Sequence, residues 1–169
     1  MALTNDQITA QNFKDFYDQI RPYLNGGITP TTNGGTGNAD GYIRTGHKAN
    51  TTIGTGATIE GASNEASANY THAEGYSTKA TVQNAHAEGS STTASGNGAH
   101  AEGYSTTASA QGAHAEGQSN TASGAASHAE GMSNTASARS THAQGESCTA
   151  SASYASAGGH GVNAGYESQ

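Results

Sequence analysis

Six histidines recur every 14 residues, and each begins a short motif whose side chains can exchange protons or bind a metal ion. The motif reads His-Ala-Glu-Gly in five copies and His-Ala-Gln-Gly in the sixth. Side chains two residues apart lie on the same face of a β-strand, so each imidazole would stand beside a carboxylate. The histidines are His72, His86, His100, His114, His128 and His142. The glutamates are Glu74, Glu88, Glu102, Glu116 and Glu130.

Two kinds of chemistry fit this pattern. Structural zinc sites use closed sets of ligands at irregular spacing, whereas this array is open and its units are equivalent. The spacing therefore favours a structural ladder in which each His N–H donates to a Glu carboxylate, between coils or between chains. Metal binding by the same six histidines is the second interpretation, and we expect no bound cofactor. Because a carboxylate raises the pKa of a neighbouring imidazole, we also expect the assembly to survive at about pH 5.5.

Catalysis fits the array poorly, because an active site needs one distinctive constellation of side chains. The His and Glu residues repeat together, so no pair of them is unique. No nucleophile stands in a distinctive setting either. We therefore expect a protein that is not an enzyme.

The repeat itself predicts the fold. With the histidine as coil position 0, position 1 is almost always Ala, position 3 is Gly, position 5 is Ser and position 8 is Ala. Fixed-period repeats of this kind form solenoids in which each unit contacts its neighbours. Alternation within strands predicts two short strands and two tight turns per coil, hence an all-β, parallel β-roll over residues 44–169 with an interior of alanine alone.

Such an interior is too small to hold the fold by itself. Burying one alanine methyl contributes about 1 kcal/mol, and ordering each residue of the backbone costs roughly as much. Ladder hydrogen bonds and the burial of an outer face must add to it. We therefore expect a homotrimer.

Residues 1–24 differ in composition from the rest of the chain. Apolar residues at three- and four-residue spacings predict an amphipathic α-helix, which we expect to serve trimerisation or attachment. Those we assign to that role are Ile8, Phe13, Phe16, Ile20 and Leu24. Residues 25–43, rich in Gly, Thr and Asn, are expected to form a linker.

The composition excludes several classes of partner. The net charge is −7 with neutral histidines, which argues against nucleic acid. No apolar run approaches the length of a membrane span, and no signal-peptide pattern opens the chain, so we expect no membrane insertion. The single cysteine, Cys148, rules out a disulfide within the chain.

Coils of about 14 residues with a strand ending in Ala-x-Gly, followed by Ser-x-x-Ala, resemble the heads of trimeric autotransporter adhesins. That resemblance implies a left-handed parallel β-roll and a trimer. In that family the strand reads Val-Ala-Ile-Gly and its two apolar positions are thought to face the trimer interior; here they are His and Glu.

The His-Ala-Glu-Gly array more closely resembles phage and prophage tail proteins of Gram-positive bacteria, in which a self-cleaving intramolecular chaperone domain often follows. Residues 33–37, Asn-Gly-Gly-Thr-Gly, resemble a segment near the start of phage tail-fibre proteins. Residues 164–169 resemble the junction before the chaperone domain. The chaperone domain is not part of this sequence, so the resemblance implies no protease activity here.

Two columns of the repeat vary from coil to coil, at positions 4 and 12. Variable side chains on an invariant scaffold are where recognition of a host-surface glycan or protein could reside; the alternative is that they are solvated turn residues. The large side chains in these columns are Tyr70, Tyr76, Tyr104, Met132 and Tyr154.

The sequence thus predicts a non-enzymatic, trimeric fibre segment of a phage or prophage tail. We expect it to be assembled in the bacterial cytoplasm, to join a tail or baseplate component through its N-terminus, and to act as a rigid spacer, a receptor-binding module or both. One alternative is the head of a bacterial surface adhesin. Another is an ice-binding solenoid, because the Thr-Ala-Ser segments would form regular rows of hydroxyl groups.

Overall fold

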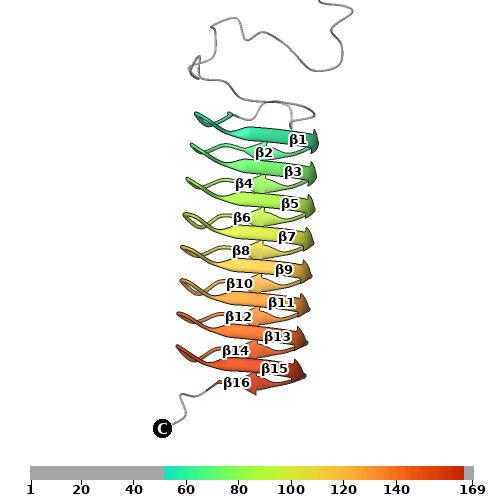
Figure 1. Cartoon of the computed structure of the whole chain (residues 1–169), viewed down its shortest axis with the longest axis vertical. Helices are drawn as coiled ribbons and strands as arrows, with labels where there is room; N and C mark the ends of the chain where they lie inside the picture. Colours follow the sequence, from blue (N-terminus) through green and yellow to red (C-terminus); the bar gives the residue numbers. More distant parts are fainter. Residues whose placement is uncertain (1–51, 166–169) are drawn as a thin grey trace, which may run out of the picture. The chain divides into compact units, whose positions relative to one another are not determined.

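The computed structural model describes residues 52–165, which form an all-β parallel solenoid of 14-residue coils (Figure 1). All described residues belong to one compact unit of the chain. The predicted helix over residues 1–24 and the predicted linker over residues 25–43 lie outside the described part. The predicted β-roll is confirmed for the residues that the structure covers.

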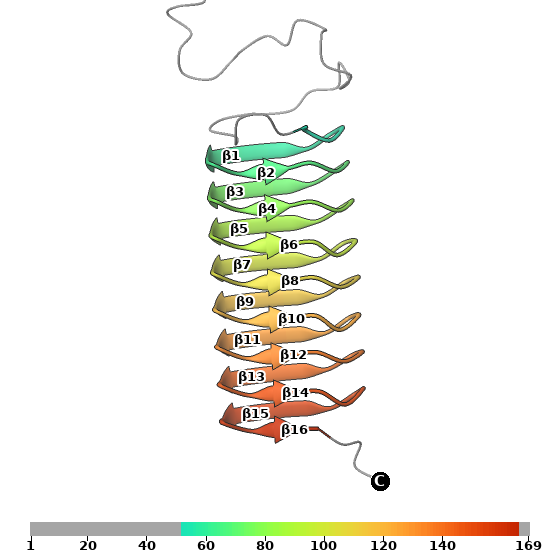
Figure 2. The same cartoon turned by 180° about the vertical axis from the view of Figure 1, so that it is seen from behind.

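Each coil contributes one long and one short strand, which run in opposite directions (Figure 1, Figure 2). The long strands are β1 (Thr58–Ala62), β3 (His72–Tyr76), β5 (His86–Ser90), β7 (His100–Tyr104), β9 (His114–Gln118), β11 (His128–Met132), β13 (His142–Glu146) and β15 (Ser156–His160). The short strands are β2 (Glu65–Ala66), β4 (Lys79–Ala80), β6 (Thr93–Ala94), β8 (Thr107–Ala108), β10 (Thr121–Ala122), β12 (Thr135–Ala136), β14 (Thr149–Ala150) and β16 (Asn163–Ala164).

The strands form two eight-stranded parallel sheets in which each strand pairs with its counterpart one coil away. The pairing is in register, so His86 lies beside His100 and Ala87 beside Ala101. Every column of the repeat is therefore a row of equivalent side chains in space. This register turns the 14-residue sequence period into continuous stripes on the surface of the solenoid.

Two turns close each coil, and both contain a residue with positive φ. Position 5 is a serine in this conformation from Ser63 to Ser147, and Ser105 has a φ of 55°. Its backbone N–H donates to the carbonyl of Ser90 in the preceding coil at 2.9 Å. At position 12, the N–H of Gly112 donates likewise to Asn97 at 2.9 Å. Hydrogen bonds between coils thus hold a conformation that L-residues ordinarily avoid.

The glycine at position 3 is required by the closeness of the next coil. Gly103 has a φ of 100°, and a Cβ added there would lie 2.1 Å from the carbonyl oxygen of Gly117. The same approach recurs along the column, from Gly61 to Gly145. Only glycine allows this backbone conformation and this contact together.

The interior is narrow, and alanines at positions 1 and 8 are fully buried along most of the stack. The expectation of an alanine-only interior is nevertheless wrong. From Asn64 to Cys148, position 6 also points inward, and it carries polar residues or cysteine. Those that are fully buried are Asn64, Thr78, Thr92, Thr106, Asn120, Asn134 and Cys148. Apart from Ile59 at position 1, this column supplies most of the largest buried side chains of the core.

The buried asparagines bind neighbouring coils together. The amide of Asn120 donates to the carbonyl of Glu116 in its own coil and to that of Gly131 in the next, at 2.7 Å. Its Oδ1 accepts the backbone N–H of Asn134 at 2.7 Å, and Asn134 repeats the arrangement toward Cys148 at 2.8 Å. A buried amide with all these partners satisfied specifies the register of the coils as well as stabilising them.

We predict that Gly103→Ala destabilises the solenoid far more than Gly112→Ala. Both positions have positive φ, but a Cβ at Gly112 meets nothing within 4 Å. Alanine already occupies the same position in the next coil, at Ala126, with positive φ. Gly112→Ala should cost about 1 kcal/mol, whereas Gly103→Ala should cost about 3 kcal/mol or more because backbone must move. Thermal and denaturant melts measure both. Equal costs would mean that the coils are not stacked this closely.

Candidate functional site: the histidine–glutamate column

The six predicted histidines and the glutamates beside them form one stripe on the sheet of long strands, called here the histidine–glutamate column. Position 0 and position 2 flank the buried alanine of position 1, so their side chains point to the outer face. The histidine side chains are 35–42% exposed, as those of His72 and His142 illustrate. The stripe is therefore only half covered by the chain's own atoms.

The imidazole rings stack along the column. The centroids of His100 and His114 lie 4.8 Å apart with planes at 4°, and those of His86 and His100 lie 4.6 Å apart at 13°. His72 and His86 keep the 4.6 Å separation but are tilted by 50°. The spacing is that of neighbouring strands, so the sheet sets it. The tilted pair shows that an imidazole ring can turn without changing the separation of the ring centroids.

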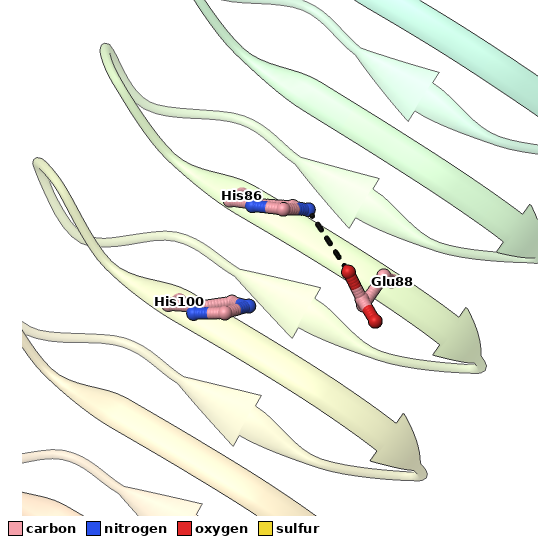
Figure 3. Close-up of side chains that lie close together, drawn as sticks. All are labelled: His86, Glu88 and His100. Atoms are coloured by element: carbon pink, nitrogen blue, oxygen red, sulfur yellow. Dashed lines mark ion pairs between the residues drawn. The ribbon is translucent and has the colours of Figure 1, made fainter.

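Each glutamate lies near the histidine of its own coil at the start of the column. The Nε2–Oε2 distance is 3.3 Å for His72 and Glu74 and also for His86 and Glu88 (Figure 3). It is 3.5 Å for His100 and Glu102, then 3.9 Å for the pairs His114–Glu116 and His128–Glu130.

Later glutamates also reach the histidine of the next coil. Glu116 lies 4.0 Å from His128, and Glu130 lies 3.4 Å from His142. His142 depends on this contact because its own coil carries Gln144 in place of glutamate. A carboxylate can thus face two histidines, one on each side.

Among the described residues, hydrogen bonding along the column is sparse. His72 is hydrogen-bonded to Glu74 at 3.3 Å. Five other Nε2 atoms are shielded from solvent yet make no hydrogen bond to any described residue, although carboxylates lie near them. They belong to His86, His100, His114, His128 and His142. Buried polar atoms normally have partners, so these nitrogens form a row with unused binding capacity.

Burial lowers the pKa of His86 from its ordinary value of 6.5, and the imidazoles of His100 and His72 lower it further. The carboxylates of Glu88 and Glu74 act in the opposite direction without reversing the shift. The charged form loses hydration at the sheet surface and meets like charges one coil away.

The pKa of His128 is also lowered, first by burial and next by His114, with a further lowering from His142. Glu130 and Glu116 raise it by less. The expectation that glutamate raises the histidine pKa is therefore wrong at His86 and His128. Burial, together with one imidazole on each side in the stacked column, outweighs the carboxylates at these two positions.

Three groups of side chains along the column could hold a metal ion. In each, two histidines from neighbouring coils and the glutamate of the first coil offer ligand atoms within 4.8 Å of one another. The groups are His86–Glu88–His100, His100–Glu102–His114 and His114–Glu116–His128. Figure 3 shows the first: two imidazoles project the same way from neighbouring strands, with the Glu88 carboxylate near the nitrogen end of His86.

The five large variable residues do not form one patch. Tyr76, Tyr104 and Met132 end long strands at position 4 and are 60%, 57% and 39% exposed. Tyr70 and Tyr154 lie in the opposite turn at position 12, with φ of 58° and 64°, and belong to coils far apart in the stack. The structure thus separates the two predicted columns along two edges of the solenoid.

Sequence reasoning missed two features of this face. One is the row of unpartnered Nε2 atoms, which depends on side-chain geometry and leaves no trace in the residue types. The other is an additional pair at position 4, where His160 lies 4.0 Å from Glu146 of the preceding coil. Position 4 varies from coil to coil, and the available signal was that an acidic residue and a histidine occupy it in successive coils.

No family model matches this chain, and neither a curated protein nor a solved structure is similar enough to count as a match. Within residues 52–165 there is no helix with the length and apolar character needed to cross a bilayer.

We predict that acid destabilises the folded chain through His86 and His128. The pKa of each of these imidazoles is lower in the folded chain than in the unfolded chain, so the folded chain binds fewer protons. The free energy of unfolding therefore falls as the pH drops from about 6.5 through the folded pKa. The melting temperature should therefore be lower at about pH 5.5 than at about pH 7.5. Differential scanning calorimetry across this range measures it.

The control is the double variant His86→Asn/His128→Asn, which keeps polar groups at both positions but removes the titration. It should show a smaller loss of melting temperature on acidification than the parent. A parent that is more stable at the lower pH would contradict the lowered pKa values.

Proposed function

We propose that this chain is a non-enzymatic fibre segment, trimeric, of a phage or prophage tail. Its β-solenoid acts as a rigid spacer, and its variable columns offer a surface for a host glycan or protein. The N-terminal residues attach the segment to a tail or baseplate component. Assembly takes place in the bacterial cytoplasm before incorporation into the virion.

One observation carries the proposal: the unbroken register of the two eight-stranded sheets over the whole described stack. No loop interrupts the coils between Thr58 and Ala164, so the 14-residue period never slips. A solenoid of this kind keeps a fixed length and direction, because each coil is fixed by hydrogen bonds to the next. A spacer needs that property, whereas a binding cleft or an active site normally requires an inserted loop.

Two features of the stack support association with further copies. The core consists mostly of alanine methyl groups and buried Thr and Asn side chains, and offers little apolar area. The histidine–glutamate column runs along one sheet from β3 to β13 and is partly exposed. A continuous stripe repeats the same contact at every coil, so symmetric packing of copies would multiply one small interaction by the number of coils.

Exposed aromatic residues support a recognition role for the variable columns. Tyr76 and Tyr104 lie two coils apart on one edge and are more than half exposed. Tyrosine offers a large, rigid face and a hydroxyl group, a combination common where proteins bind sugars or other proteins. Apart from Met132, the remainder of that column is polar or small, as at Ser90 and Gln118.

We predict that the full chain is a trimer. Light scattering coupled to size exclusion should give a mass three times that of the 16.8 kDa chain at micromolar concentration. Phe13→Ser/Phe16→Ser, in the predicted helix, should weaken the trimer, whereas the surface change Gln118→Ser should leave it intact. A folded, stable monomer would contradict the proposal, and a dimer would contradict its stoichiometry.

The receptor role has its own test. Fluorescently labelled full chain should bind Gram-positive host cells, and Tyr76→Ser/Tyr104→Ser should reduce that binding at least several-fold while melting like the parent. The matched control is Gln118→Ser, in the same column. Equal binding by all three proteins would remove the recognition role and leave the spacer role alone.

A further inference from the structure

A row of shielded Nε2 atoms lies 3.3–3.9 Å from carboxylates without a hydrogen bond to them, and the fibre role does not use this feature of the described residues. A merely structural ladder would hydrogen-bond each nitrogen to a carboxylate, as His72 is bonded to Glu74. Instead, the nitrogens of His86, His100 and His114 are shielded from water and make no hydrogen bond to any described residue. Such nitrogens can donate a lone pair to a metal ion.

We propose that the histidine–glutamate column binds divalent transition-metal ions of the zinc class between successive coils. Each site consists of two histidine nitrogens from neighbouring long strands and one glutamate oxygen. The sites are His86–Glu88–His100, His100–Glu102–His114 and His114–Glu116–His128.

The donor set selects the class of ion. Imidazole nitrogen suits zinc, copper and nickel, whereas magnesium and calcium prefer oxygen ligands throughout. Two neutral nitrogens with one carboxylate match the ligand types of many zinc sites, and solvent can fill the remaining positions.

The side chains must bring their ligand atoms closer together by up to about 1.4 Å. Zinc–nitrogen bonds are about 2.0–2.1 Å and the usual geometry is tetrahedral, so two nitrogens on one ion lie about 3.4 Å apart. The ligand atoms of each site already lie within 4.8 Å of one another. Ring rotation can supply the difference, because His72 and His86 are tilted by 50° at the same centroid spacing as the parallel pairs. The backbone ladder need not move.

Shared ligands set the stoichiometry. The middle site uses His100 and His114, which also belong to the first and the third site. The first and third sites share no residue, so they can be filled together while the middle one stays empty. Two ions per chain is therefore the expected number for these three sites.

Isothermal titration calorimetry of the full chain tests this, with protein purified without a polyhistidine tag, stripped with chelator and titrated with zinc chloride at about pH 7.5. We expect two ions per chain at micromolar affinity and a rise in melting temperature with zinc. His100→Ala/His114→Ala removes at least one ligand from every site and should reduce affinity at least tenfold. His160→Gln, a histidine outside the sites, should bind like the parent.

A second variant guards against a loss of fold. Glu88→Gln/Glu116→Gln keeps every stacked ring and removes the carboxylate from the first and third sites, so it should melt like the parent without metal. Only the middle site keeps all its ligands, so the two ions bound by the parent should fall to one. Absence of zinc binding by the parent would overturn the proposal. Binding that survives unchanged in His100→Ala/His114→Ala or in Glu88→Gln/Glu116→Gln would overturn it as well.

Discussion

The close, in-register stacking of each coil on the next is the constraint on which the rest of the molecule depends. At the glycine of position 3 the backbone of one coil touches that of the next so closely that no Cβ fits between them, as at Gly103 and Gly117. The serine turns are held by hydrogen bonds to the preceding coil. Because the coils cannot slip past one another, every residue type that recurs in the sequence recurs at one strand spacing in space.

This stacking compensates for a small core. Alanine columns allow the two sheets to lie near each other, and buried asparagines such as Asn120 join adjacent coils through two hydrogen bonds. Satisfied amides inside a narrow interior favour one register over its alternatives, which methyl groups alone do not. The same register brings the histidines of the outer face to within 5.1 Å of their neighbours. The packing of the core and the spacing of the histidines on the outer face therefore both follow from the in-register stacking of the coils.

Much of the fold could be predicted from the period alone, because a strict repeat leaves few ways to arrange Ala-x-Gly and Ser-x-x-Ala segments. Strand positions, both turns and the outward histidines follow from alternation. The inward direction of position 6 could not be read from the sequence, since Thr, Asn and Cys there are also ordinary turn residues. The unpartnered nitrogens and the lowered pKa of His86 depend on ring placement. The left-handed winding, the trimer and the tail location stay predictions, because they rest on resemblance or on residues outside 52–165.

The central claim is that the coils stack in register at one strand spacing, and pulsed electron paramagnetic resonance measures it directly. Spin labels are placed in pairs at the exposed position 4. One chain carries them at Tyr76 and Glu146, which are 70 residues or five coils apart, and a second chain carries them at Ala62 and Glu146, which are six coils apart. Cys148 is replaced by threonine, and labelled chains are diluted with unlabelled ones. With about 4.8 Å per coil, the account predicts narrow distributions centred on backbone separations of about 24 Å and about 29 Å. Broad distributions, or two distances that do not differ by about one coil, would contradict it.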